Sequence, residues 1–357
     1  MPATSESRAG SRLAWGLLAA VLTARLLTMA AYPITDTTEA RYAEISRLML
    51  TSGDWLVPQV APGVPFWGKP PLFAWLTAGA FRVLGIGEFA ARLPHFALAM
   101  ASLWLVTVAA ARETAPHKRL LPALVLASTP LFYVSAGTVM TEAGLLFSTT
   151  LAMTGFWLCV RHGQRSWGLA FFAGLGLGML AKGPIALVMS LLPIAMWLLI
   201  NKEWSRLRLL PWTGGLLLAL LICLPWYLAA EYHSPGFLAY FLVGEHLLRF
   251  IQPGWEGDLY GNAHTEPLGM IWWFWFQATA AWGLLLAVAL IVLGRRTRGG
   301  RRRLARNDWR RYLLCWMVAP LLFFTFSSNI LWTYVITGLP ALALLLADDG
   351  VLREARA

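Results

Sequence analysis

Long apolar runs separated by short polar segments make up most of this chain. Because a helix needs about 20 apolar residues to cross a bilayer, each run of this kind predicts a membrane-spanning helix. The runs cover residues 13–31, 93–111, 118–135, 143–160, 167–180, 184–200, 209–229, 270–293, 312–326 and 331–347. We therefore expect an all-α polytopic membrane protein with about ten spans, several of them short and extended into the interface.

Three apolar segments need separate interpretation. A full span at 71–84 would reverse the side of every later loop, so we expect this segment to form a helix that lies on the membrane. Residues 1–12 are too polar for a signal peptide, and no small-residue cleavage site follows the run 13–31, which predicts an uncleaved anchor. The run GLGLG at 174–178 lies inside a span and is typical of helix packing.

The composition supports a membrane location. Of the 357 residues, 58% are hydrophobic and 13% are charged, whereas soluble proteins carry about 25% charged residues. The chain also has 19 Trp, a residue that favours membrane interfaces. Cys159, Cys223 and Cys315 lie far apart in apolar runs, and this gives no support for a disulfide framework or a cysteine metal site.

The placement of charge predicts an orientation. A net charge of +11 would suggest a nucleic-acid partner in a soluble protein. Here a cytoplasmic N-terminus puts most of the 29 Lys and Arg in cytoplasmic segments, including the basic run 295–311, as the positive-inside rule requires. We therefore expect a multi-pass protein of the plasma (inner) membrane without a nucleic-acid partner. Its two large outer segments, 32–92 and 231–268, would carry an active site that faces outward, to the periplasm.

The first outer segment begins with polar residues that lipid cannot satisfy. Asp36-Thr-Thr-Glu39-Ala-Arg41-Tyr42 leads into the amphipathic run AEISRLML, and a helix that starts at Thr38 would place Glu39 in its first turn. One interpretation is a carboxylate that acts as a general base, with Arg41 neutralising an anion. The alternative is a capped interfacial helix whose charges are solvated.

Further outer residues suit a phosphate ligand. Lys69 is held on a stiff backbone in PFWGKPP, and Lys182 stands in the short turn AKGP. Glu142 opens a span, where a carboxylate is costly unless it has a partner or a role. Tyr334 follows a short polar outer turn and can donate to a phosphate. Each residue can also be a simple interface anchor.

His246 and Arg249 in EHLLRF share one helical face and can present imidazole and guanidinium to one ligand. The six histidines include no ligand-spaced pair such as HExxH. No cofactor is therefore predicted from the residues. His233 and His264 flank the segment, however, so a divalent metal is not excluded.

Taken together and in this order, these motifs resemble the family 39/83 glycosyltransferases. This family of polytopic enzymes has the GT-C fold and includes protein O-mannosyltransferases and the lipid A aminoarabinose transferase. The resemblance covers nearly the whole chain. Its motifs are EARYAEISRLML with SGDW, WGKPP, RLP at 92–94, AKGP, EHLLRF and TYVITGLPALALL.

The resemblance implies a GT-C helix bundle and a sugar donor linked to a polyprenyl phosphate. A lipid, glycan or protein would accept the sugar on the outer face of the membrane, with inversion. An acidic residue of the first outer loop would take the acceptor proton, and the candidates are Asp36, which we favour, and Glu39. The residues expected to bind substrate are Arg41, Tyr42, Lys69, Glu142, Lys182, His246, Arg249 and Tyr334.

Two positions depart from the family pattern. Many members have Asp where this chain has Thr38, and Glu where it has Gly68. The base would therefore be displaced, and a metal or acceptor contact made by that Glu would be lost or supplied elsewhere. The chain ends ten residues after the last predicted span, so we expect one transmembrane domain, 1–357, without the soluble C-terminal domain of longer relatives.

Two other functions compete with glycosyl transfer. A transporter or flippase of a polyprenyl-linked or other amphipathic lipid would share the polytopic architecture and the cationic sites. No inverted repeat or paired broken helices are evident in the pattern, and the ionisable residues gather at one surface, which favours the enzyme. Because Thr38 and Gly68 depart from the family pattern, a scaffold protein without catalytic activity is a third alternative.

Overall fold

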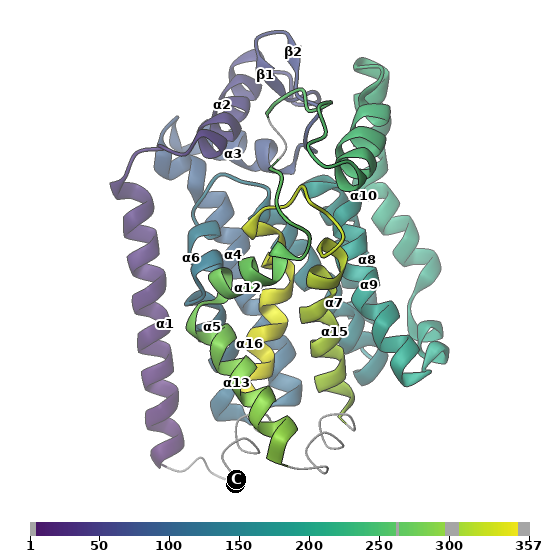
Figure 1. The fold of residues 1–357 in the computed structure, drawn as a ribbon. Helices are drawn as coiled ribbons and strands as arrows, with labels where there is room; N and C mark the ends of the chain where they lie inside the picture. The colour runs from purple at the N-terminus through teal and green to yellow at the C-terminus, as the bar shows by residue number, and fades with distance from the viewer. Residues whose placement is uncertain (1–4, 262–263, 297–306, 349–357) are drawn as a thin grey trace.

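The computed structural model describes residues 5–261, 264–296 and 307–348, which form a bundle of helices (Figure 1). The α-helices are α1 Ser5–Ala31, α2 Thr37–Ser52, α3 Leu72–Leu84, α4 Glu88–Glu113, α5 Leu121–Ala127, α6 Pro130–Ser135, α7 Glu142–His162, α8 Arg165–Lys182, α9 Pro184–Asn201, α10 Trp212–His233, α11 Arg249–Ile251, α12 Met270–Thr279, α13 Ala281–Arg296, α15 Asp308–Phe324 and α16 Leu339–Ala347. The other elements are the 3₁₀-helices η1 Pro116–Lys118, η2 Trp204–Leu209 and η4 Trp332–Gly338, the π-helix η3 Ala239–Leu248, and an antiparallel hairpin of β1 Gln59–Ala61 and β2 Val64–Pro65. The predicted all-α architecture is confirmed.

Five helices in the described part of the chain are long and apolar enough to cross a membrane. They are α4, α7, α9, α10 and the segment Gly10–Ala31 of α1. The pair α12 and α13 makes a sixth if it is counted as one bent span. The protein is therefore a multi-pass membrane protein, whereas the number of ten spans stays a prediction.

Two of the predicted spans are broken rather than continuous. The run 270–293 bends by 110° between α12 and α13, at Ala280, whose φ of 47° lies in the left-handed region. The run 118–135 divides into α5 and α6, because Pro130 disfavours helical backbone at Thr129, which is extended. Each break has too few polar residues to divide a long apolar run, so hydropathy alone did not reveal them.

Helix α7 lies in the interior of the bundle, and glycine lets α8 approach it closely. Almost all of α7 is buried. A Cβ on Gly174 of α8 would lie 2.7 Å from backbone atoms of both Ser148 and Ala152 on α7. Only glycine allows this contact, so the packing role predicted for the run 174–178 is confirmed at this position.

Contacts show which connecting segments lie together at each end of the bundle. At one end, His162 lies 2.9 Å from Glu113, and Arg161 pairs with Asp308 at 3.3 Å. All four residues stand in or next to segments predicted to be cytoplasmic. These segments, which the charge pattern places on one side of the membrane, therefore lie together at one end of the bundle. At the other end, α2, α3 and the β-hairpin lie together (Figure 1). The centre of the basic run, 297–306, lies outside the described residues.

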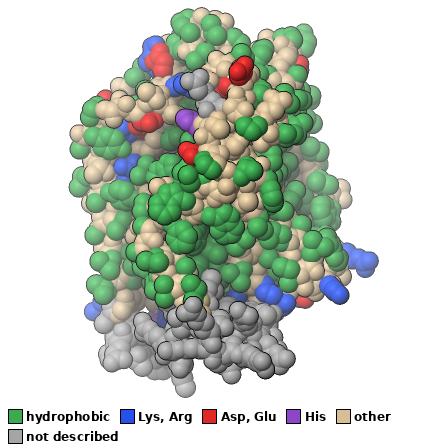
Figure 2. All heavy atoms as spheres, in the orientation of Figure 1, with side chains coloured by type: hydrophobic (Ala, Val, Ile, Leu, Met, Phe, Trp, Pro, Cys, Tyr) green, Lys and Arg blue, Asp and Glu red, His purple; other side chains and the backbone are tan. Residues whose placement is uncertain are grey.

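The surface has the same two-ended organisation. In Figure 2, hydrophobic side chains form a broad band across the middle of the visible face, and most charged side chains lie above or below it. A bilayer accommodates such a band because lipid tails solvate apolar side chains and exclude charge. The polar upper end in this view holds the first outer segment.

Helix α2 begins one residue earlier than expected. Asp36 is its N-cap, and the Oδ1 atom accepts hydrogen bonds from the backbone N–H groups of Thr38 (2.9 Å) and Glu39 (2.8 Å). The predicted amphipathic face is confirmed, because Ile45 and Met49 are buried. The following helix, α3, has 13 residues and is too short to span a bilayer.

Candidate active site

A cavity of about 540 Å³ opens at the end of the bundle that carries α2. Both outer segments line it, together with the ends of α7, α8 and α9 and the polar turn before η4. All eight residues expected to bind substrate line this one cavity: Arg41, Tyr42, Lys69, Glu142, Lys182, His246, Arg249 and Tyr334. Motifs spread over most of the chain therefore meet in one place.

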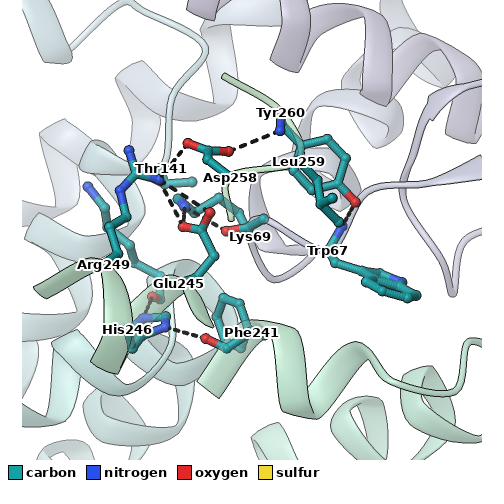
Figure 3. Close-up of polar contacts among 12 residues, drawn as sticks. Trp67, Lys69, Thr141, Phe241, Glu245, His246, Arg249, Asp258, Leu259 and Tyr260 are labelled. Atoms are coloured by element: carbon teal, nitrogen blue, oxygen red, sulfur yellow. Dashed lines mark hydrogen bonds and ion pairs between the residues drawn. The ribbon is translucent and has the colours of Figure 1, made fainter. Parts of the chain in front are cut away.

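A chain of alternating charges crosses the cavity (Figure 3). Lys69 Nζ lies 3.1 Å from Glu245 Oε2, and Arg249 Nη1 lies 3.2 Å from both Glu245 oxygens and 3.1 Å from Asp258 Oδ2. Tyr240 also donates to Glu245 at 3.2 Å. The i, i+4 spacing of Glu245 and Arg249 places both on one face of the helix. Glu245 thus fixes the two cations that reach it from different outer segments.

The titration behaviour of Glu245 and His246 follows from their surroundings. Burial raises the pKa of Glu245, but Lys69 and Arg249 outweigh it and the net shift is downward. Burial lowers the pKa of His246, so its ring is neutral at pH 7. The ring Nδ1 lies 2.7 Å from the Phe241 carbonyl oxygen, and Nε2 lies 3.3 Å from that of Lys182. A neutral ring donates through one nitrogen, and the shorter contact places the proton on Nδ1.

A second ion pair lines the other side of the cavity. Lys182 donates to Glu142 Oε1 at 2.8 Å, and its Nζ lies 5.2 Å from the centre of the Tyr334 ring. The Thr141 hydroxyl lies 3.3 Å from Glu142 Oε2. Glu142 is 5% exposed at its side chain, so Lys182 supplies the partner that a carboxylate at a helix start in the membrane needs.

Arg41 differs from the other cations of the cavity. It makes no ion pair or hydrogen bond with any side chain that the structure describes, whereas Lys69, Lys182 and Arg249 all have carboxylate partners. Burial, followed by the charge of Glu142, raises the pKa of the neighbouring Tyr42 hydroxyl far above its usual range. Tyr42 is therefore a neutral hydrogen-bond donor beside a guanidinium that is open to an anion.

The two predicted bases do not line the cavity. Glu39 is buried, and its oxygens accept from Arg92 Nε at 2.8 Å and Nη2 at 3.0 Å and from the Val139 N–H at 3.1 Å. These contacts argue against Glu39 as a base, because both oxygens are occupied away from the cavity. Asp36 is exposed and caps α2, and the two residues that follow it, Thr37 and Thr38, line the cavity. Its catalytic role stays a prediction.

No three His, Cys, Asp or Glu side chains within the described residues are arranged to hold a metal ion. At Gly68, where many family members have Glu, a Cβ would lie 2.9 Å from the Phe66 ring and 3.3 Å from the Tyr260 ring. The Tyr260 hydroxyl holds its own ring by donating to the Pro65 carbonyl and accepting from the Trp67 N–H, both at 2.9 Å. A Glu at position 68 would therefore require the Phe66 ring to move.

Sequence reasoning missed three residues that organise the site. Glu245 stands inside EHLLRF, and its i, i+4 spacing to Arg249 was a signal for an ion pair. Asp258 lies in the second outer segment without a motif around it. Arg92 belongs to the motif RLP at 92–94, but its partner Glu39 is 53 positions away, and sequence does not show such a pairing.

The fold and the cavity define a class, namely polytopic membrane proteins with the GT-C architecture and a cationic site at one end of the bundle. The chain belongs to the dolichyl-phosphate-mannose-protein mannosyltransferase family, whose model matches residues 15–241. The family expected from the motifs is thereby confirmed.

Individual relatives extend this assignment. The undecaprenyl phosphate-alpha-4-amino-4-deoxy-L-arabinose arabinosyl transferase of Erwinia tasmaniensis is 31% identical over 88% of this chain and 55% of its own length. The corresponding transferase 1 of Sodalis glossinidius is 33% identical over 87% of this chain and 54% of its own. The chain thus spans little more than half the length of these relatives.

Solved structures show the same fold. ArnT from Cupriavidus metallidurans bound to undecaprenyl phosphate superimposes with a TM-score of 0.80 at 22% identity, over 94% of this chain and 59% of that one. The oligosaccharyltransferase of Archaeoglobus fulgidus gives a TM-score of 0.58 at 13% identity, over 94% of this chain and 50% of that one. The expected GT-C fold is confirmed.

Acid is expected to destabilise this end of the protein. His246 has a folded pKa below that of the unfolded chain, so unfolding takes up a proton and stability falls as the pH drops below about 6.5. The lowered pKa of Glu245 adds a second loss below about pH 4.3. The midpoint of thermal unfolding in detergent, measured across pH, should be constant above about pH 7 and fall below it. In His246→Gln the first decline should become smaller than in the wild type; an unchanged decline would contradict the assignment.

Proposed function

We propose that the protein is a membrane glycosyltransferase. It moves a sugar from a polyprenyl-phosphate-linked donor to a lipid, glycan or protein acceptor, with inversion at the anomeric carbon. The observation that carries the proposal is one cavity with two kinds of lining residue. Four cations line it, and so do the apolar residues Leu145, Ile185, Val188, Met189, Phe250 and Phe323. A donor that joins a phosphate to a lipid needs both.

The cations have capacity left for a phosphate. Arg41 has no carboxylate partner among the described residues, and the Nε atom of Arg249 is buried there without a hydrogen-bond partner. Lys69 and Lys182 each contact one carboxylate. When the bond from sugar to phosphate breaks, negative charge develops on the leaving polyprenyl phosphate, and preorganised cations stabilise this charge. Tyr42 and Tyr334 add neutral donors at the same place.

The relatives support the choice of donor. Their name states that they are arabinosyl transferases of undecaprenyl phosphate-linked 4-amino-4-deoxy-L-arabinose, and the solved ArnT binds undecaprenyl phosphate. An undecaprenyl-phosphate-linked sugar is therefore the donor that we propose for this chain, with a lipid of the cell envelope as the first acceptor to test.

We propose further that the protein lies in the plasma (inner) membrane with its N-terminus in the cytoplasm and its cavity facing the periplasm. The positive-inside pattern supports this orientation. A periplasmic active site also supports a lipid-linked donor. Nucleotide sugars are cytoplasmic, so a periplasmic enzyme must receive its sugar through the membrane. The chain would act as one transmembrane domain, 1–357, in which the outer segments 32–92 and 231–268 form the active site.

A donor-consumption assay in detergent tests the function. The purified protein should release undecaprenyl phosphate from an undecaprenyl-phosphate-linked aminoarabinose when a lipid extract from cells without the protein is added, and mass spectrometry should show the sugar mass on one lipid. Lys202→Ala, an exposed change at the opposite end of the bundle, is the matched control. A flippase would consume no donor, because detergent leaves no second compartment. Such a result would overturn the proposal in favour of transport.

A further inference from the structure

We propose that Asp258 is the carboxylate that removes the proton from the acceptor, in a niche that it forms with Arg41 and Gly261. This inference rests on the proposed glycosyltransferase function. It assigns a residue of the second outer segment to the role expected of Asp36 or Glu39 in the first. The cavity places it there: Asp258 lines the cavity, whereas Asp36 and Glu39 do not.

Three carboxylates of the described residues line the cavity, and their contacts distinguish them. Glu245 receives donors on both oxygens from Lys69, Arg249 and Tyr240. Glu142 has a contact on each oxygen, from Lys182 at 2.8 Å and from the Thr141 hydroxyl at 3.3 Å. Asp258 also has one contact on each oxygen, but the Arg249 nitrogen that contacts Oδ2 is shared with Glu245. Asp258 is therefore the carboxylate with spare capacity.

The spare capacity lies on Asp258 Oδ2. Its other oxygen, Oδ1, accepts the backbone N–H of Tyr260 at 2.9 Å, which orients the group. Oδ2 receives a single contact, from Arg249 Nη1 at 3.1 Å, and that nitrogen also contacts both oxygens of Glu245. Because one guanidinium nitrogen has two hydrogens for these three oxygens, Oδ2 keeps a lone pair for an acceptor hydroxyl.

Gly261 leaves room beside this oxygen. A Cβ on Gly261 would lie 3.9 Å from Asp258 Oδ2 and 3.8 Å from Arg41 Nη1. The missing side chain therefore leaves a niche that borders both the Asp258 carboxylate and the Arg41 guanidinium, which has no partner among the described residues. An acceptor hydroxyl that donates to Asp258 here stands next to the cation available to the donor phosphate. The groups proposed for proton removal and for the leaving group thus border the same niche.

The reaction balances with these groups alone. The acceptor O–H bond breaks, and its proton passes to Asp258 Oδ2, which becomes a carboxylic acid. The acceptor oxygen forms the new bond to the anomeric carbon while the bond from that carbon to the phosphate oxygen breaks. The electron pair leaves with the phosphate, so the donor's singly charged diester becomes a doubly charged polyprenyl phosphate, which the cations stabilise.

The experiment compares Asp258→Asn with Asp36→Asn in cells that lack the native protein. Mass spectrometry of whole lipid and envelope glycan extracts measures the transferred sugar mass and the polyprenyl-phosphate sugar that accumulates. Loss of a general base typically costs about 10²–10⁴-fold in rate. We expect Asp258→Asn to lose transfer to this extent, with donor accumulating, and Asp36→Asn, which keeps a side-chain oxygen to cap α2, to lose far less.

Donor retention separates catalysis from folding. Asp258→Asn protein purified in detergent should retain polyprenyl-phosphate sugar, detected by mass spectrometry of the bound lipid, at the level of the wild type. Asp258→Glu should recover part of the transfer. Gly261→Ala fills the niche at ordinary contact distance and should lower transfer while donor retention is unchanged. Loss of the retained donor in Asp258→Asn would indicate a structural role and overturn the assignment.

The outcomes also separate this inference from the proposed function. If the wild-type protein restores no sugar mass to any lipid or glycan, the glycosyltransferase function itself fails. If the wild type restores the sugar and Asp258→Asn does so equally well, only the role of Asp258 fails. In that second case, a loss of transfer in Asp36→Asn would return the base to the first outer segment.

Discussion

Lys69→Ala is expected to lower transfer about 10²–10³-fold while the protein remains folded in the membrane. This is the range found when one preorganised donor to a developing negative charge is removed. The ammonium lies 3.1 Å from Glu245, and the side chain is partly exposed to the cavity. It is therefore held in place by a buried carboxylate and by the Gly68 carbonyl, to which it donates at 2.6 Å, and one ammonium hydrogen is left for the leaving phosphate. Single-turnover release of polyprenyl phosphate from the lipid-linked donor measures the effect.

Lys69→Ala also leaves the buried Glu245 carboxylate without one of its cationic partners, which lowers the stability of the protein. The double variant Lys69→Ala, Glu245→Gln removes this negative charge, so its thermal unfolding midpoint should be higher than that of Lys69→Ala while transfer stays low. Lys202→Ala, which removes the same side chain at the opposite end of the bundle, should transfer at the wild-type rate. If Lys69→Ala alone releases polyprenyl phosphate at the wild-type rate, Lys69 does not serve the leaving group.

The residues of the cavity could be predicted because each stands in a short motif that survives as a local pattern. Arg41 and Tyr42 follow the start of α2, Lys69 lies between prolines, and Lys182 precedes the break between α8 and α9. Such motifs predict which side chains face the outer surface. Resemblance to a known family then supplied the expectation that they meet, and the structure shows that they do.

The carboxylate that we propose as the base could not be predicted in the same way, because its position depends on contacts between distant segments. Glu39 and Asp36 both stand in the polar outer segment and satisfy the same local pattern. Only the fold shows that Arg92 holds Glu39 away from the cavity. Asp258 has no local pattern around it, and its position depends on Arg249 and the turn to Tyr260.

The breaks in the spans have a similar cause. Hydropathy measures how apolar a run is, and the residues on both sides of Ala280 are equally apolar. The bend of 110° there depends on one backbone conformation. At Thr129 the following proline was visible in the sequence, and a stricter use of the proline rule would have divided the run 118–135.

Arg92→Ala is expected to destabilise the protein by about 3–5 kcal/mol, the cost of leaving Glu39, the other member of a buried ion pair, without its partner. Arg92 is fully buried. Besides Glu39 on α2, it donates to the carbonyl oxygens of Met29 and Tyr32 at 2.9 and 2.8 Å. One guanidinium therefore joins the end of α1, the start of α2 and helix α4.

Helix α2, which carries Glu39, offers a matched control. Arg47 also pairs with a glutamate, Glu44, at 2.7 Å, but 40% and 48% of these side chains are exposed. An exposed pair of this spacing contributes at most about 0.5 kcal/mol, so Arg47→Ala should leave unfolding in detergent almost unchanged. If Arg92→Ala lowers the stability as little as Arg47→Ala does, water must reach Glu39, and its side chain is less buried than the structure shows.

A loss of stability at Arg92 should also reach the cavity. Arg41 stands two residues after Glu39 on α2, so the pair that fixes the start of this helix also fixes the guanidinium proposed to meet the donor phosphate. Arg92→Ala protein that remains folded should therefore retain less lipid donor than the wild type, although residue 92 does not line the cavity. Mass spectrometry of the copurified lipid tests this, and full retention would show that the start of α2 is held in place without Arg92.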